Sequence, residues 1–129
     1  MIEPHERGVA GVLRRRILGA SQYSWQGLRA CYRYEEAFRV ELLLGALLLP
    51  VAFWLARSVV ELCLLLGAML VVLIVEVLNS ALETAVDLFS REPNELAGRS
   101  KDQGSAAVLL SMILFFMVWG FIIALRFTS

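Results

Sequence analysis

Residues 106–125, AAVLLSMILFFMVWGFIIAL, are twenty residues that contain no charged side chain. At about 1.5 Å per residue, an α-helix of this length crosses a hydrocarbon layer of roughly 30 Å, so we predict a transmembrane helix here. The composition agrees, because 59% of the 129 residues are apolar, 19% are charged and the mean hydropathy is +0.70. Soluble domains are about 45–50% apolar and about 25% charged. We therefore expect one small integral membrane domain over residues 1–129.

Two further apolar stretches upstream predict two more membrane spans. Residues 42–56, LLLGALLLPVAFWLA, are long enough to cross if the helix begins near Glu35, and a kink at Pro50 is tolerable. The next stretch is apolar from Leu62 to Val75 and continues as EVLNSALETAVDLF to Phe89, with ionisable residues at helical spacing. We expect an all-α membrane protein with spans at about 35–56, 61–89 and 105–126.

The N-terminal region predicts a helix of a different kind. Residues 9–34 place apolar side chains at steps of three or four among arginines and aromatic residues, which is typical of an amphipathic helix on a membrane surface. A coiled-coil or calmodulin-binding helix is the alternative. Residues 1–8 are polar and do not resemble a cleavable signal, and we expect the lone His5 to be a tail residue without a ligand role.

The distribution of charge predicts the topology. Seven arginines precede the apolar stretch at 42–56 and three basic residues lie between the second and third spans, whereas only Arg57 and Arg126 fall on the other side. The positive-inside rule then places the N-terminus in the cytoplasm and the C-terminus outside. The net charge is zero, which argues against nucleic acid as a partner. With only Cys31 and Cys63, we expect free cysteines.

The second span carries a row of polar residues. Asn79, Ser80, Glu83 and Asp87 follow Glu76 by 3, 4, 7 and 11 residues, so all five share one stripe roughly 100° wide. We expect Glu76 to lie somewhat under 10 Å inside the hydrocarbon boundary. A charged carboxyl there costs at least about 2.5–3.5 kcal/mol, so such groups usually face a protein interior or a watery cavity. The alternative is a neutral, hydrogen-bonded acid, with the amide and hydroxyl holding helices together.

The segment after this span completes a candidate phosphate site. Pro93 and Asn94 are expected to end the helix, with Asn94 capping a new turn. The segment that follows contains Lys101, the only lysine in the chain. A lysine beside acidic residues and arginines is the composition of a site for a polyphosphate with its magnesium, although no glycine-rich nucleotide motif is present. The alternative is an ordinary charged loop in which Arg99 and Lys101 attract anionic lipid.

Four blocks of this sequence resemble the small bacterial integral-membrane diacylglycerol kinases, in order and at the family's spacing. They are YSWQGLR at 23–29, EEAFRVE at 35–41, EVLNSALE at 76–83 and ELAGRSKDQGSAAV at 95–108. The resemblance runs from about residue 16 to about residue 125. It implies a homotrimer in the bacterial inner membrane with active sites between subunits on the cytoplasmic side. The implied reaction moves the γ-phosphoryl of MgATP to the primary hydroxyl of sn-1,2-diacylglycerol, which gives phosphatidic acid.

The resemblance also implies residue roles. Glu76 matches the general base, and Glu35 and Glu83 match the carboxylates that hold Mg²⁺. The residues expected to bind ATP are Arg16, Tyr23, Glu35, Glu83, Glu92, Asn94, Lys101 and Asp102. The residues expected to bind the lipid are Arg16, Trp25, Arg29, Glu41, Glu76, Asn79 and Ser105. Pro93-Asn94 stands where relatives often carry an aromatic residue or histidine.

Several alternatives remain open at this point. An undecaprenol kinase shares the implied fold, but those relatives usually show Asn and His where this chain has Ala37 and Glu41. In a proton-coupled transporter Glu76 would carry a proton, which leaves Lys101 and Asp102 without a role. A structural membrane subunit would form no ATP-dependent product. Glu35 also stands four residues before Arg39, the spacing of a simple helical ion pair.

Overall fold

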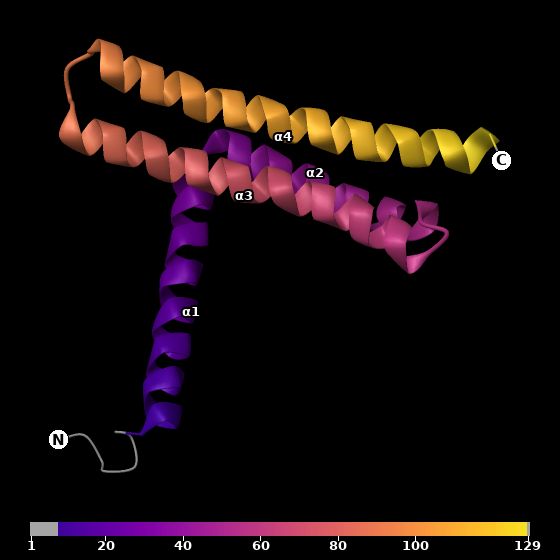
Figure 1. Cartoon of the computed structure of the whole chain (residues 1–129), viewed down its shortest axis with the longest axis horizontal. Coiled ribbons are helices and arrows are strands. Elements are labelled where there is room, and N and C mark those ends of the chain that lie inside the picture. The colour runs from indigo at the N-terminus through magenta and orange to yellow at the C-terminus, as the bar shows by residue number, and fades with distance from the viewer. Residues whose placement is uncertain (1–7, 129) are drawn as a thin grey trace. The chain divides into compact units, whose positions relative to one another are not determined.

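The structure is a computed structural model, which describes residues 8–128 and contains four helices and no strand among them (Figure 1). The predicted all-α class is therefore confirmed. The chain divides after Tyr34 into two compact units, and each is described by itself. The expectation for His5 falls outside the described residues.

The first unit consists of helix α1, Val9–Tyr34. Nearly all of its side chains are exposed, including the aromatic rings of Tyr23 and Trp25. Near the end of α1 the Arg33 guanidinium lies 5.4 Å from the centre of the Tyr34 ring, within the range of a cation–π contact.

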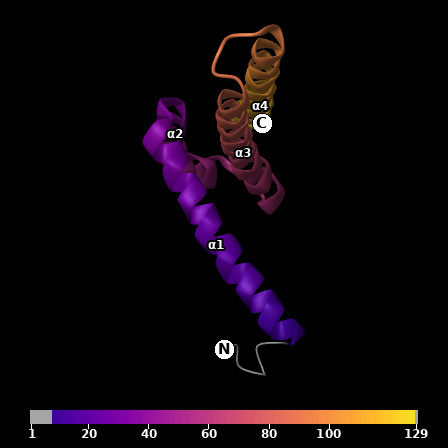
Figure 2. The ribbon, with the colours of Figure 1, turned by 90° about the vertical axis from the view of Figure 1, so that its left-hand side faces the viewer.

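The second unit holds helices α2 (Glu36–Leu55), α3 (Val59–Phe89) and α4 (Glu95–Thr128). Short connections at 56–58 and 90–94 reverse the chain, so consecutive helices run in opposite directions (Figure 2). We call the end of this bundle at 90–94 the loop end and the end at 56–58 the turn end. Helix α3 packs mainly against α4 and to a smaller extent against α2. Helix α2 continues through Pro50.

The hydrophobic core of the second unit lies toward the turn end. Ala52 and Leu55 of α2, Leu65 of α3 and Trp119 of α4 are buried together there. The Trp119 indole Nε1 donates a hydrogen bond of 3.2 Å to the Leu65 carbonyl oxygen. This bond ties α4 to α3, and it satisfies the one donor that a buried indole carries.

All three helices of the second unit are long and apolar enough to cross a membrane. The chain is thus a multi-pass membrane protein. Only 17–22% of each apolar window is buried within the chain, so most of the apolar side chains face outward. Such extensive apolar surface indicates contact with lipid or with other protein. Helix α4 starts ten residues before the third predicted span at 105, because the polar segment from Glu95 is also helical.

Candidate active site

The polar face of α3 is the centre of the candidate site. Glu76 is 8% exposed and Ser80 is 8% exposed, whereas Asn79 and Glu83 are half-buried. A carboxyl this deep in an apolar helix faces the helix packing and not the surrounding surface. This observation agrees with the requirement that an ionisable group within a span face the protein interior.

Glu41 of α2 meets Glu76 of α3 across the helix contact. The two carboxyl groups lie close enough to interact. The second oxygen of Glu41, Oε2, is buried and accepts no hydrogen bond from the described residues. A buried acceptor without a donor is costly, so this oxygen is suited to receive a hydrogen bond from a bound molecule.

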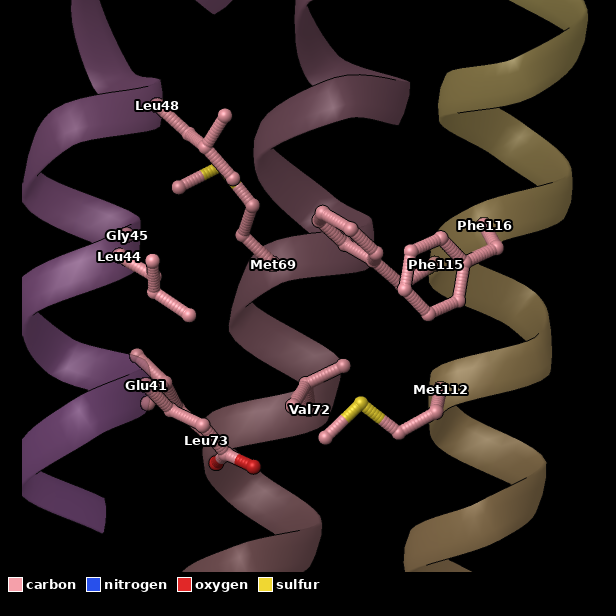
Figure 3. A pocket seen from close by; sticks show the side chains of 10 residues that line it. All are labelled: Glu41, Leu44, Gly45, Leu48, Met69, Val72, Leu73, Met112, Phe115 and Phe116. Atoms are coloured by element: carbon pink, nitrogen blue, oxygen red, sulfur yellow. The ribbon is translucent and has the colours of Figure 1, made fainter. Parts of the chain in front are cut away.

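An apolar groove extends from Glu41 toward the turn end (Figure 3). It has a volume of about 140 Å³, and its walls come from α2, α3 and α4. The lining residues besides Glu41 are Leu44, Gly45, Leu48, Met69, Val72, Leu73, Met112, Phe115 and Phe116. An apolar groove of this kind fits the apolar chain of a ligand.

Asn79 connects the polar face of α3 to α4. Its Nδ2 donates a long hydrogen bond of 3.4 Å to Glu83 Oε1, one turn along the same helix. Its Oδ1 is buried and accepts no hydrogen bond from the described residues. Gly104 of α4 lies directly against this amide, because a methyl group added at Gly104 would overlap the Asn79 side chain and stand 2.9 Å from Leu82. The close approach of the two helices at this point therefore depends on glycine.

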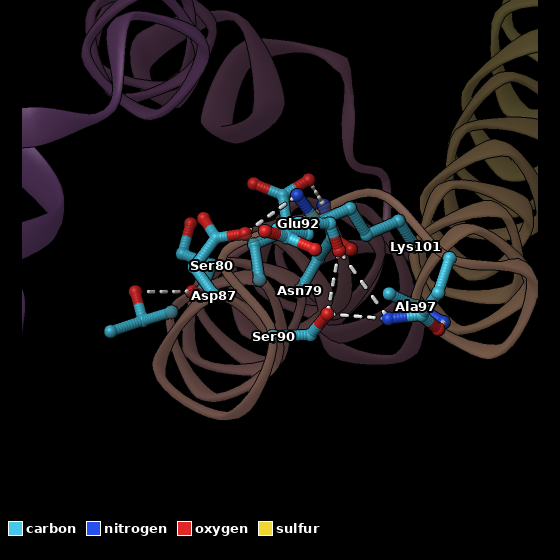
Figure 4. A network of polar contacts seen from close by, with 10 residues as sticks. Asn79, Ser80, Asp87, Ser90, Glu92, Ala97 and Lys101 are labelled. Carbon is cyan, nitrogen blue, oxygen red and sulfur yellow. Dashed lines mark hydrogen bonds and ion pairs between the residues drawn. The ribbon is translucent and has the colours of Figure 1, made fainter.

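Lys101 of α4 lies at the loop end of the same polar face. Its Nζ pairs with Oδ1 of Asp87 at 2.7 Å, and Asp87 stands one turn beyond Glu83 on α3 (Figure 4). The Lys101 side chain is 43% exposed and that of Asp87 is 63% exposed. The pair thus brings the only lysine in the chain to the row of acids on α3 while leaving it open to solvent.

Residues 90–94 close the loop end through a small hydrogen-bond network. Ser90 Oγ donates to the Glu92 carbonyl oxygen at 2.7 Å, and Asn94 Nδ2 donates to Ser90 Oγ. Asn94 Oδ1 accepts from the Ala97 backbone N–H at 2.9 Å, which caps the first turn of α4. The predicted cap at Asn94 is therefore confirmed. Glu92 itself projects an exposed side chain.

The profile of the prokaryotic diacylglycerol kinase family matches residues 22–123. The chain belongs to this family. It is 41% identical to the diacylglycerol kinase of Haemophilus influenzae, over 81% of this chain and 88% of the relative. It is 45% identical to that of Escherichia coli, over 81% and 85%, and 43% identical to that of Pseudomonas aeruginosa, over 84% and 89%. A kinase reaction depends on a nucleotide, typically with a divalent metal.

The donor set on α3 fits a divalent cation in such a kinase. Carboxylate oxygens, as in Glu83, are ligands that Mg²⁺ prefers. Within residues 8–128 no three His, Cys, Asp or Glu side chains are grouped to hold a metal by themselves. Mg²⁺ needs only one or two carboxylates where phosphates supply the remaining oxygens.

The other predicted site residues of this diacylglycerol kinase family member lie at the helix ends or on α1. Glu35 precedes α2 and is half-buried, and Asp102 and Ser105 are exposed on α4. Arg16, Tyr23, Trp25 and Arg29 are exposed on α1, within the other unit. At about 100° per residue, Arg16 and Tyr23 share one face of α1, and Trp25 and Arg29 share the opposite face. Arg16 precedes the range that the family profile matches.

Two residues of the site were not assigned a role from the sequence. Asp87 was placed on the polar stripe, but its pairing with Lys101 joins two helices. Gly104 stands three residues after Lys101, and therefore on the same face of α4, which is the signal that could have identified it.

Proposed function

We propose that this chain is an ATP-dependent diacylglycerol kinase that transfers the γ-phosphoryl of MgATP to the primary hydroxyl of sn-1,2-diacylglycerol. The products are phosphatidic acid and ADP. The observation that carries the proposal is the buried carboxyl of Glu76 beside Glu41, which lines one end of an apolar groove, in a member of this kinase family. The groove suits an acyl chain, and the carboxyl groups suit the glycerol hydroxyl beside it.

Glu76 acts as the general base in this proposal. Its carboxylate takes the proton of the substrate hydroxyl as that oxygen bonds to the γ-phosphorus of ATP, and the bond from this phosphorus to ADP breaks. Glu41 accepts a hydrogen bond from the glycerol end of the lipid through its unpartnered Oε2. Asn79 and Ser105 complete the lipid end, and Trp25, Arg29 and Arg16 of α1 contact the lipid from the surface helix.

The nucleotide end of the proposed site uses the acids and bases toward the loop end. Glu35 and Glu83 would hold Mg²⁺, which would neutralise charge on the phosphate oxygens. Lys101 supplies a fixed positive charge for the same phosphates. The remaining proposed nucleotide contacts are Arg16, Tyr23, Glu92, Asn94 and Asp102. Phosphoryl transfer mainly requires alignment and charge neutralisation, so these residues suffice without a glycine-rich nucleotide motif.

We further propose a homotrimer in the bacterial inner membrane, with α1 as an amphipathic surface helix. The large apolar surface that one chain leaves uncovered supports contacts between copies. The distribution of basic residues supports a cytoplasmic N-terminus and active site, with the C-terminus outside. Diacylglycerol stays in the bilayer and ATP in water, so Glu76 must work just below the headgroups on the cytoplasmic side.

The test is phosphate transfer in mixed micelles with radiolabelled ATP, Mg²⁺ and diacylglycerol. Glu76→Gln should lower the rate by about 100-fold or more, since a general base contributes about 10²–10⁴-fold, while the variant still assembles. Glu61→Gln is the matched control on α3, because Glu61 pairs with Arg57 at the turn end. Full activity of Glu76→Gln would remove Glu76 from the mechanism. Undecaprenol offered in place of diacylglycerol should give little product, and a preference for it would overturn the substrate assignment.

A further inference from the structure

The ion pair between Asp87 and Lys101 joins two helices at the loop end. The separation of Nζ and Oδ1 is 2.7 Å, whereas the pairs Arg57–Glu61 and Glu95–Arg99 are wider, at 3.5 and 3.6 Å. In those two pairs the partners stand four residues apart in the sequence, and helix geometry alone brings them together. Asp87 and Lys101 are fourteen residues apart, so their contact depends on how α4 packs on α3.

Nothing in the proposed reaction gives Asp87 a role. Resting on the proposed function, we infer that Asp87 is a positioning residue for Lys101. It holds the ammonium group beside Glu83, so that the phosphates of MgATP meet a cation that is already in place. Asp87 itself touches neither the nucleotide nor the reacting atoms.

The chemistry of the pair indicates that Asp87 positions Lys101 and does not block its access to phosphate. A lysine ammonium has three donors, and the contact with Asp87 Oδ1 occupies one of them. Lys101 remains 43% exposed, so the other two donors can reach phosphate oxygens without breaking the pair. A lysine side chain has four rotatable carbon–carbon bonds, and a charge-assisted hydrogen bond restricts its motion before the nucleotide arrives.

The first measurement is the steady-state kinetics of Asp87→Asn. The KM for MgATP should rise about five- to tenfold, the order of one ordinary hydrogen bond. The values of kcat and of the KM for diacylglycerol should stay within about twofold, because the chemistry at Glu76 is unchanged. Asp87→Glu keeps the charge and should recover at least half of the loss. An unchanged or lower KM for MgATP would overturn the inference, and a lower one would mean that Asp87 blocks the lysine.

The second measurement asks whether Asp87 acts through Lys101. MgATP binding by the detergent-solubilised protein is measured calorimetrically for the Lys101→Met variant and for the same variant carrying Asp87→Asn. Equal affinities are expected, since the aspartate has no ammonium left to hold. A further loss of fivefold or more in the double variant would show that Asp87 acts on the nucleotide directly and would overturn the inference.

A charge swap separates positioning from a merely structural role. With Asp87→Lys and Lys101→Asp combined, the ion pair can form again, but the cation is anchored on α3. Thermal stability should match the wild type, whereas the KM for MgATP should stay at least fivefold raised. If both the thermal stability and the KM for MgATP return to the wild-type values, the ion pair has only a structural role and the inference is overturned.

Glu61→Gln is the control for the kinetic arm. It removes an acid from a pair at the other end of α3, about 39 Å from Asp87 for 26 residues of helix, and should change no kinetic constant. If the wild type forms no labelled phosphatidic acid, the proposed function has failed. The calorimetric comparison still tests the positioning role in that case.

Discussion

Gly104 is the position where the smallest change tests the site most directly. The substitution is Gly104→Ala, which adds one methyl group where α4 lies against Asn79 and Leu82. Alanine in place of glycine within a helix normally stabilises by about 0.5–1 kcal/mol. Overpacking a contact costs about 1–3 kcal/mol. We therefore expect a net loss of about 1–2 kcal/mol in the free energy of unfolding.

The activity of Gly104→Ala should fall more than its stability. The methyl group can fit only if the Asn79 amide turns away, which disturbs its contact with Glu83, or if α4 moves outward, which draws Lys101 away from Asp87. We expect at least a tenfold loss of phosphatidic acid formation at a temperature where the variant is folded. The assay pairs the mixed-micelle reaction with thermal inactivation in detergent.

Gly120→Ala is the matched control on the same helix. Apart from the adjoining residues and backbone of α4 itself, no atom lies within 4 Å of a methyl group added at Gly120, so this variant should be as active as the wild type and equally or more stable. A Gly104→Ala variant with the stability and activity of Gly120→Ala would refute the reasoning, because it would mean that α3 and α4 do not approach closely at Asn79.

Two further predictions concern the ends of the site. Asn94→Ala removes the cap of α4 and should cost about 1 kcal/mol of stability, seen as earlier thermal inactivation, whereas Asn94→Ser should restore most of it. Met69→Trp should fill the apolar groove and raise the KM for diacylglycerol severalfold without changing the KM for MgATP. A rise in the KM for MgATP alone would mean that the groove does not bind the lipid.

The sequence was sufficient to predict the features that depend on one helix. Glu76 and Glu83 share a stripe because residues seven apart lie on nearly the same face, and Asn94 caps α4 because an amide oxygen there reaches the N–H of Ala97. The buried position of Glu76 was also predictable from the cost of an exposed carboxyl in an apolar helix.

Features that depend on two helices could not be predicted in the same way. The spacing of polar residues on α3 does not determine how α4 is rotated against it, and this rotation decides that Lys101 meets Asp87 and that Gly104 meets Asn79. The continuation of the turn capped by Asn94 into the third span was not predicted either, because a charged segment that precedes a span can be a loop or a part of the helix.

Helix α4 is one uninterrupted rod of 34 residues, about 51 Å long, whereas the hydrocarbon layer is roughly 30 Å thick. No hinge separates the part that carries Lys101 from the part that contains Trp119. A bilayer of shorter or longer fatty acids changes the inclination of such a rod. Lys101 would then move with the tilting helix, so the thickness of the surrounding lipid would alter the phosphate-binding end of the site.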